Sequence, residues 1–254
     1  MTLSSRDSIV PDWPAPAGVR CLVTTRHGGT SQGVYSSLNL GTHVGDDPGA
    51  VASNRAIVMA PIGGRPVWLD QVHGTRVIDA SDFVESDQPP QADAALTRKD
   101  GVACTVMTAD CLPVLFCDDA GSVVAAAHAG WRGLLAGILE ETVAAMDVPA
   151  KSLMAWLGPA IGPNAFEVGD EVRTAFVAVD ENAVSAFRPS PSGKCLADIY
   201  LLARQRLAGQ GITRVFGGSF CTVSDPERFF SYRRDGQTGR MVSMIWLEPS
   251  ISSS

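Results

Sequence analysis

Hydrophobic positions recur along the chain at two spacings, and these predict where strands and helices lie. Apolar residues repeating every three or four positions predict helices over 47–60, 133–146, 169–179 and 197–209. Short apolar, β-branched runs bounded by turn residues predict strands over 20–25, 66–72, 76–80, 101–108, 112–117, 122–128, 153–158, 214–218 and 241–247. A doubly wound sheet would place a helix after each strand. The order is too rich in strands for that, so it predicts an α/β (α+β) fold with mixed sheets.

The length and apolar content set the size of the core. A chain of 254 residues with 45% hydrophobic residues is long enough to bury roughly three quarters of its unfolded surface. The sequence shows no internal repeat of fixed period. We therefore expect one domain over residues 1–254, with 1–18 and 249–254 as loose termini.

Charge and cysteine content exclude several classes of protein. The formal net charge of -7 provides no basic surface for general nucleic-acid binding. The sequence contains no apolar stretch near the roughly 18 residues needed to cross a bilayer, and its first 20 residues lack the apolar segment of a secretory signal. The six cysteines form no C-x-x-C pair, and a chain of this size needs no disulfides. We expect a cytoplasmic monomer with reduced thiols, no membrane contact and no nucleic-acid partner.

Polar side chains that could take part in catalysis or binding gather in the segments between the expected strands. Gly, His, Asn and Arg are concentrated in five of these segments, 24–47, 70–77, 126–133, 158–169 and 231–241. Strands often hold such loops rigidly around a site. The pattern therefore favours an active site built from loops.

Three candidate metal ligands stand next to expected strands. Cys111 lies between two of them, in "TADCLPVLFC", His128 ends another, and His73 follows a third. A His2Cys set leaves one coordination position open, as in catalytic zinc sites, and its thiolate and imidazole donors favour zinc over magnesium or calcium. The spacings of 38 and 17 positions match no compact metal motif.

The same residues allow readings without a metal. Cys111 could be an inert core thiol, since free cysteine is often buried. His73 could be a loop residue bonded to backbone, and His128 could mark the entry to a helix. Alternatively, Cys111 and His128 could be the thiolate and base of a cysteine hydrolase. That reading leaves His73 without a role, so we rank the metal site ahead of it.

Several motifs resemble those of one known family. They are "TTRHGG", "NLGTHVGDD" followed by "NR", "DQVHGTRV", "ADAALT", "TADCLPVLF", "HAGWRG", "GPAIGPNAFEVG" and "FFSYRRDGQTGR". Together they resemble the YfiH-type laccase-domain family, also called polyphenol oxidases or DUF152 proteins, over about residues 20 to 247. Phe166, where the family often has tyrosine, is a mild departure.

The resemblance implies a fold and an activity. It implies a mixed β-sandwich flanked by helices, related to cysteine-hydrolase-like toxin domains. It maps the metal ligands onto His73, Cys111 and His128, normally with zinc. The implied enzyme is a purine nucleoside phosphorylase acting on adenosine, inosine, guanosine and methylthioadenosine with phosphate, and also an adenosine deaminase. Some relatives are described as peptidoglycan editing factors, which keeps a cysteine hydrolase using Cys111 as an alternative, beside a nucleoside-binding protein without turnover.

The number of histidines bears on the laccase name. A multicopper oxidase needs about ten imidazoles and a cysteine, whereas this chain has four histidines. Copper chemistry would therefore require copper in place of zinc in the His2Cys site. The H-x-E and P-C-x-x-C signatures of zinc nucleobase deaminases are also absent from the sequence, so a deaminase site here would be of separate origin.

Phosphorolysis requires an anion site, and arginine binds phosphate with two parallel hydrogen bonds. Arg55 and Arg26 are the candidates, with Asn39 and His43 nearby in the polar loop. Arg55 also falls on an expected helix, where it could be a solvated surface charge.

Two carboxylates stand beside the expected ligands. Asp110 and Asp93 could orient a histidine or transfer protons, so Asp110 joins His73, Cys111 and His128 as a catalytic candidate. Both could equally serve to cap turns.

The segment 232–240 contains Asp235-Gly236, which predicts a hairpin turn. Its arginines Arg233, Arg234 and Arg240 could bind an anion. The aromatic residues Phe229, Phe230 and Tyr232 could stack on a purine or pack in the core.

Overall fold

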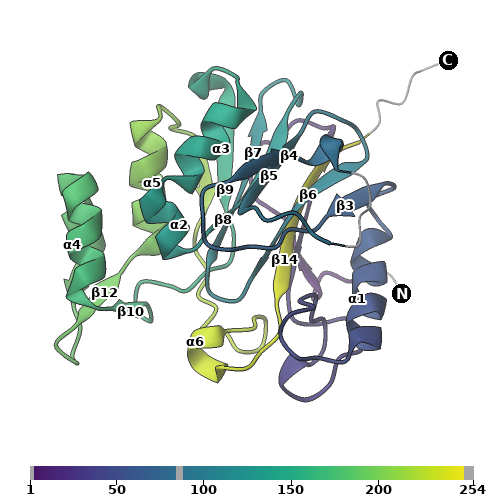
Figure 1. The fold of residues 1–254 in the computed structure, drawn as a ribbon, viewed down its shortest axis with the longest axis horizontal. Helices are drawn as coiled ribbons and strands as arrows, with labels where there is room; N and C mark the ends of the chain where they lie inside the picture. Colours follow the sequence, from purple (N-terminus) through teal and green to yellow (C-terminus); the bar gives the residue numbers. More distant parts are fainter. Residues whose placement is uncertain (1–2, 84–87, 249–254) are drawn as a thin grey trace.

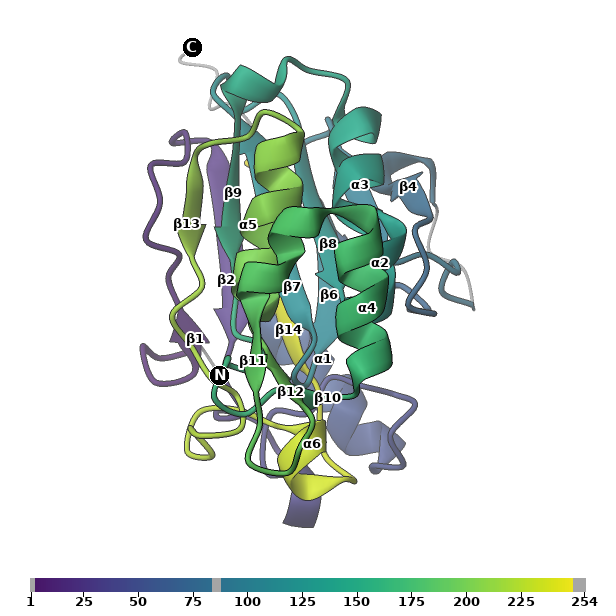
Figure 2. The same ribbon diagram turned by 90° about the vertical axis from the view of Figure 1, so that its left-hand side faces the viewer.

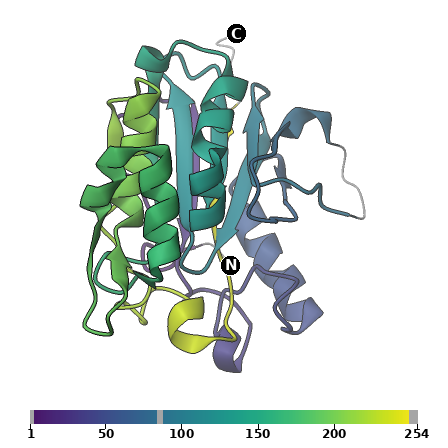
Figure 3. The ribbon, with the colours of Figure 1, turned by 60° about the vertical axis from the view of Figure 1, so that its left-hand side comes forward.

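Two β-sheets stack face to face, and helices cover the outer face of each (Figure 1). This is a computed structural model, and it describes residues 3–83 and 88–248. Helices α2, α3, α4 and α5 lie on one side of the paired sheets and α1 lies on the other (Figures 1 and 3). The expected mixed sheets flanked by helices are thus confirmed.

The larger sheet has six strands in the order β13-β9-β7-β8-β5-β4. Its outer pairs, β13 with β9 and β4 with β5, are parallel, and the inner pairs are antiparallel. The strands are β4 (Val77–Asp79), β5 (Ala94–Thr97), β7 (Leu112–Asp118), β8 (Val124–Ala129), β9 (Leu153–Leu157) and β13 (Val215–Gly217).

The second sheet has five strands in the order β1-β2-β14-β6-β3. Only the pair of β3 with β6 is parallel among the described strands of this sheet. The strands are β1 (Ser8–Ile9), β2 (Val19–Thr24), β3 (Arg65–Val67), β6 (Val102–Thr108) and β14 (Met241–Leu247).

The described residues form six α-helices and four 3-10 turns. They are α1 (Pro48–Met59), α2 (Trp131–Ala136), α3 (Ile138–Met146), α4 (Asp170–Val179), α5 (Ile199–Gly209) and α6 (Tyr232–Asp235), with 3-10 turns η1 (Gly33–Tyr35), η2 (Ala80–Asp82), η3 (Ala150–Ser152) and η4 (Glu181–Ala186). A small sheet lies beside α4 (Figure 2), made of β10 (Glu167–Val168), β12 (Cys195–Ala197) and β11 (Phe187–Pro189). None of the helices in the described part of the chain is long and apolar enough to cross a bilayer.

Successive side chains of a strand point to opposite faces of its sheet, so each strand contributes to a core on either side. On β14, Ile245 and Leu247 join the core between the two sheets, whereas Met244 and Trp246 join the core under α1. Every residue of β14 is buried, so both faces of the strand are covered. The same alternation on β7 sends Phe116 toward the helices α2 to α5.

Several sequence-based boundaries were wrong. The helix expected over 133–146 is two helices, because Gly137 has a φ of 103° and ends α2 before α3 begins. The strand expected over 66–72 ends at Val67, and the rest is loop. The expected hairpin at 232–240 is instead the short helix α6, in which the Ser231 side chain accepts a hydrogen bond from Arg234 N–H.

The segment expected to be a loose N-terminus is partly attached to the sheets. Ser8 and Ile9 of β1 pair with β2, and the Asp12 carboxylate accepts a hydrogen bond from the indole of Trp156 at 3.0 Å. Residues 249–254, the other expected loose end, lie outside the described residues.

Candidate active site

Strand pairing brings Cys111, His128 and Asp93 to the same edge of the larger sheet. Cys111 directly precedes β7, and Pro113 of that strand lies opposite His128 of β8. Asp93 directly precedes β5 on the other side of β8, and its carbonyl accepts the His128 N–H at 2.7 Å. These residues are 35 or fewer positions apart in sequence, and the antiparallel register makes them neighbours.

His73 reaches this edge from the loop between β3 and β4. Its φ of 61° bends the backbone, and the Asp93 carboxylate holds the bend. That carboxylate accepts the N–H groups of Val72 at 3.2 Å, His73 at 2.9 Å and Gly74 at 2.7 Å. The bend places His73 Nε2 3.7 Å from Cys111 Sγ.

His73, Cys111 and His128 form a compact donor set. Their ligand atoms lie within 4.8 Å of one another, and no other such cluster occurs in residues 3–83 and 88–248. The rings of His73 and His128 meet edge to face, with centroids 4.8 Å apart. Gly130 makes room for the set, because a Cβ there would lie 2.8 Å from His73 Cδ2 and 3.0 Å from Cys111 Sγ. Two imidazoles and a thiolate fit zinc or copper.

Asp93 also fixes the orientation of His128. Its Oδ1 lies 2.8 Å from His128 Nδ1, and both side chains are buried. Burial alone would raise the pKa of Asp93, but the hydrogen bonds from His128 and from the His73 loop hold it below its usual value. A carboxylate on Nδ1 leaves Nε2 of His128 free to bind a metal, which is the usual arrangement at metal-bound histidines.

Without a metal, Cys111 and His128 favour an ion pair. Burial opposes charge on both, yet the neighbouring imidazole of His128 lowers the pKa of Cys111 to about 6. The Cys111 thiolate and the Asp93 carboxylate likewise outweigh burial and raise the pKa of His128 to about 9. The thiolate, the form that binds metals, is therefore stabilised at neutral pH.

The Asp110 carboxylate links two other segments to the base of β7. Its Oδ1 accepts the Thr222 hydroxyl at 2.5 Å, and its Oδ2 accepts the Arg233 N–H at 2.6 Å. Its backbone has a φ of 91°. These contacts indicate that Asp110 positions the Cys111 turn.

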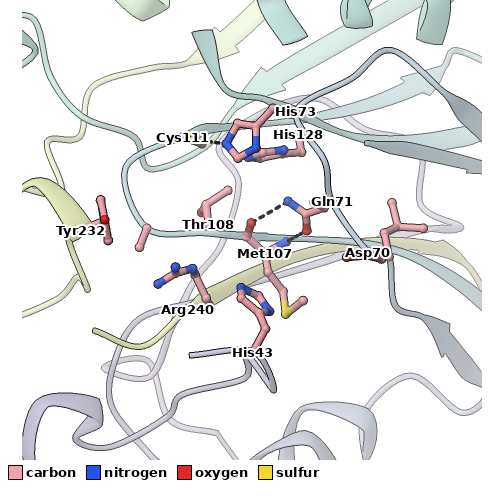
Figure 4. A pocket seen from close by; sticks show the side chains of 12 residues that line it. His43, Asp70, Gln71, His73, Met107, Thr108, Cys111, His128, Tyr232 and Arg240 are labelled. Atoms are coloured by element: carbon pink, nitrogen blue, oxygen red, sulfur yellow. Dashed lines mark hydrogen bonds between the residues drawn. The ribbon is translucent and has the colours of Figure 1, made fainter. Parts of the chain in front are cut away.

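A cavity of about 420 Å³ opens beside the donor set (Figure 4). We call it the polar cavity. His73, Cys111 and His128 lie on one side of it, and Arg240 and His43 lie on the other (Figure 4). Its remaining lining comprises Leu69, Asp70, Gln71, Met107, Thr108, Ala109 and Tyr232.

A second cavity of about 300 Å³ also reaches the donor set. We call it the aromatic cavity. It is lined by His73, Ala109, Asp110, Cys111, Trp131, Arg132, Ile161, Phe166, Ile199, Tyr232 and Arg233. His73, Cys111 and Tyr232 line both cavities, together with Ala109. The donor set therefore lies where the two cavities meet.

Of the expected substrate-binding residues, His43 lines the polar cavity, whereas Arg55, Arg26 and Asn39 line neither cavity. Arg55 donates to the Leu40 carbonyl at 3.0 Å and lies 3.9 Å from the centre of the Trp68 ring. Burial lowers the pKa of Arg55 to about 10.

Arg26 and Asn39 are also engaged in structural contacts. Arg26 donates to the Ser36 carbonyl at 2.9 Å and the Pro226 carbonyl at 3.0 Å. Asn39 is fully buried, and its Oδ1 accepts the backbone N–H of Arg240 at 2.9 Å. The structure thus gives Asn39 an indirect role, since it holds the segment that carries Arg240.

Arg132 and Arg233 line the aromatic cavity, and the arginine that faces the donor set across the polar cavity is Arg240. The sequence placed it in a charged hairpin, without a signal to single it out from Arg233 and Arg234. Arg234 donates to the Thr222 carbonyl at 2.7 Å and to the Phe229 carbonyl at 3.0 Å, so it stabilises loops. Gln71 and Thr108 of the polar cavity were missed as well: they stand in the motifs "DQVHGTRV" and "TADCLPVLF", but no chemical role was assigned to the amide or the hydroxyl.

The aromatic residues of this region have different surroundings. Phe229 and Phe230 are fully buried in a core cluster, which excludes them as stacking partners of a ligand in this conformation. Tyr232 is 62% exposed and lines both cavities.

Comparison with known proteins shows where this chain belongs. Residues 20–248 match the family described as multi-copper polyphenol oxidoreductase laccase. The chain is 58% identical to a purine nucleoside phosphorylase of Pseudomonas aeruginosa over 94% of this chain and 98% of the relative. It is 56% identical to the purine nucleoside phosphorylase YfiH of Escherichia coli K12, with the same coverage of both chains.

Solved structures show the same fold. The DUF152 protein NMB0706 of Neisseria meningitidis superposes with a TM-score of 0.93 at 55% identity, over 96% of this chain and 100% of that one. YlmD of Geobacillus stearothermophilus superposes with a TM-score of 0.87 at 30% identity, over 97% and 98% of the two chains.

Proposed function

The chain belongs to the multi-copper polyphenol oxidoreductase laccase family, and we propose that it is a zinc-dependent enzyme that cleaves purine nucleosides with phosphate. The names of its relatives from P. aeruginosa and E. coli support this activity. Inosine, adenosine, guanosine and methylthioadenosine are the proposed substrates, adenosine deamination is a proposed second activity, and the cytoplasm is the proposed location.

The observation that carries the proposal is the His73, Cys111 and His128 donor set at the meeting point of two cavities. Three protein ligands leave a coordination position open. A zinc ion held there would supply a Lewis acid toward a substrate oxygen or a bound water. The Asp93 carboxylate supports the set by fixing the ring of His128 and the loop of His73. Copper could occupy the same donors.

Arg240 and His43 are the proposed phosphate-binding residues, in place of Arg55 and Arg26. Both line the polar cavity opposite the donor set. Burial, and then the charge of Arg240, lower the pKa of His43, so its ring is neutral at pH 7 and can donate one hydrogen bond to phosphate. Burial also lowers the pKa of Arg240. Because burial disfavours the charged guanidinium, an anion in the cavity would bind favourably.

The experiment combines metal analysis with a nucleoside assay. Purified protein is expected to carry one zinc per chain and to release hypoxanthine from inosine only when phosphate is present. Cys111→Ser should lose both zinc and turnover, whereas Cys117→Ser, at a fully buried cysteine outside the site, should keep both if it folds. Turnover that survives complete removal of the metal would disprove the zinc mechanism.

A second candidate is a cysteine hydrolase, such as an enzyme that edits peptidoglycan precursors. The observation that favours it is the order Cys111, His128, Asp93, which matches a nucleophile, a base and a residue that orients the base. Trapping a covalent substrate adduct on Cys111 of the metal-free protein would support this reading. Nucleoside binding without any product would instead indicate a binding protein.

A further inference from the structure

We propose that the purine base binds in the aromatic cavity and that phosphate enters from the polar cavity, so the ribose lies between them at the donor set. This inference rests on the proposed function and names the part of the site that recognises the base. Arg132, Phe166 and Trp131 become specificity-determining residues, and none of them lines the polar cavity.

Phosphorolysis is a displacement at C1′ of the ribose, and its stereochemistry requires two separate spaces. A phosphate oxygen forms a bond to C1′ of the ribose while the bond from C1′ to N9 of the purine breaks. The electron pair of the broken bond goes to the purine, and the proton of the hydrogen phosphate dianion ends on a purine nitrogen. Attack and departure occur on opposite faces of C1′, so phosphate and base need separate spaces on the two sides of the sugar. Two cavities that share His73, Cys111 and Tyr232 provide such spaces.

The linings of the two cavities differ in their chemistry. The aromatic cavity is lined by the rings of Trp131 and Phe166 and by the apolar side chain of Ile161. Aromatic and apolar walls suit the flat face of a purine, which stacks on such rings. The lining of the polar cavity has neither Trp nor Phe among the described residues and contains Arg240, His43 and Thr108, which suit an anion.

The aromatic cavity also contains hydrogen-bond donors for the edge of the base. Arg132 and Arg233 line the aromatic cavity, and their guanidinium carbons lie 4.4 Å from the Trp131 ring centre and 5.7 Å from the Phe166 ring centre. Guanidinium groups only donate hydrogen bonds, and the N7 atom of every purine and the O6 atom of inosine and guanosine are acceptors. The two guanidinium groups lie over the faces of these rings, and they supply hydrogen-bond donors for the edge of a purine bound in the cavity.

The test separates base binding from turnover. Hypoxanthine alone should quench the fluorescence of the zinc-loaded protein, and Trp131→Phe should remove that change. Phe166→Leu should weaken hypoxanthine binding about tenfold, whereas Phe216→Leu, the same change on β13 and outside both cavities, should leave it unchanged. Phe166 is buried, so Arg132→Ala serves as a second variant at an exposed position and should raise the KM for inosine but not for phosphate.

Arg240→Gln is expected to have the opposite effect to the variants of the aromatic cavity. Its KM for phosphate should rise about tenfold, and its binding of hypoxanthine should not change. The inference is overturned if Arg240→Gln weakens hypoxanthine binding while Phe166→Leu and Arg132→Ala do not. Failure of the proposed function looks different: hypoxanthine still quenches Trp131, but inosine is not cleaved with phosphate.

Discussion

The carboxylate of Asp93 lies 2.8 Å from Nδ1 of His128 and also accepts the backbone N–H of His73 at 2.9 Å. One buried side chain thereby positions two of the three proposed metal ligands. The third, Cys111, is positioned by the turn before β7, which Asp110 connects to Thr222 and Arg233. The geometry of the donor set thus depends on two carboxylates that do not belong to it.

Asp93→Asn is expected to weaken zinc binding about 10- to 100-fold, the usual effect of losing a group that orients a metal-bound histidine. An amide has one acceptor oxygen, so it cannot satisfy both His128 and the N–H groups of the His73 loop. Competition with a chelator would measure the affinity, with Asp100→Asn, an exposed aspartate, as the control. Equal zinc affinity of Asp93→Asn and wild type would show that this carboxylate is dispensable.

Gly130→Ala is expected to reduce zinc occupancy at least about tenfold while leaving the fold intact, because its Cβ would displace a ligand that fixes the metal geometry. That Cβ would lie 2.8 Å from His73 Cδ2 and 3.0 Å from Cys111 Sγ, whereas the backbone φ of -59° suits alanine. Gly209→Ala is the matched control, because a Cβ there meets nothing within 4 Å. Zinc content by mass spectrometry and thermal unfolding would check both variants. A fully metal-loaded Gly130→Ala would contradict the close packing around the donor set.

Substitutions at Asp110 distinguish a positioning residue from a proton carrier. Asp110→Asn can keep both contacts, since its amide oxygen accepts the Arg233 N–H and the Thr222 hydroxyl can turn to accept from the amide NH2. Asp110→Ala loses both contacts and places alanine at a φ of 91°, so it should lower the free energy of unfolding by about 1–3 kcal/mol. We expect Asp110→Asn to retain most of the kcat and Asp110→Ala to lose it. An equal loss of kcat in both variants would instead indicate proton transfer by Asp110.

Asp118 is expected to stabilise the fold at neutral pH and not in acid. Burial alone would raise its pKa, but hydrogen bonds from Ser122 and Val123 lower it from 3.8. A depressed folded-state pKa contributes stability above the unfolded value, and this contribution is lost as the pH falls through the folded value. Asp118→Asn should therefore lower stability by about 1–3 kcal/mol at pH 7, and the difference should shrink below about pH 4. Urea unfolding from pH 7 to pH 3 would measure it, and a difference that grows in acid would refute the assignment.

Local patterns in the sequence were enough for the main strands, whereas the donor set also required the family resemblance. Short apolar runs predicted β6, β7, β8 and β14, because a strand between two cores must be apolar on both faces. The motifs around His73, Cys111 and His128 indicated one metal site, and the structure brings their ligand atoms within 4.8 Å. The short strand β5 was missed, since "AALT" has neither β-branched nor aromatic enrichment beyond its last residue.

Only the tertiary structure decided which polar residues face the site. Arg55, Arg26 and Arg240 all stand in polar or charged sequence, yet Arg55 stacks on Trp68, Arg26 binds loop carbonyls, and Arg240 alone of the three lines the polar cavity. The reason is physical: an arginine side chain is long enough to bond with many neighbours, so its role depends on contacts between segments far apart in sequence. The sequence by itself therefore determined the main strands and the ligand types. The cavities and the groups that line them were determined by the packing of four loops, which lie around residues 40, 73, 111 and 240.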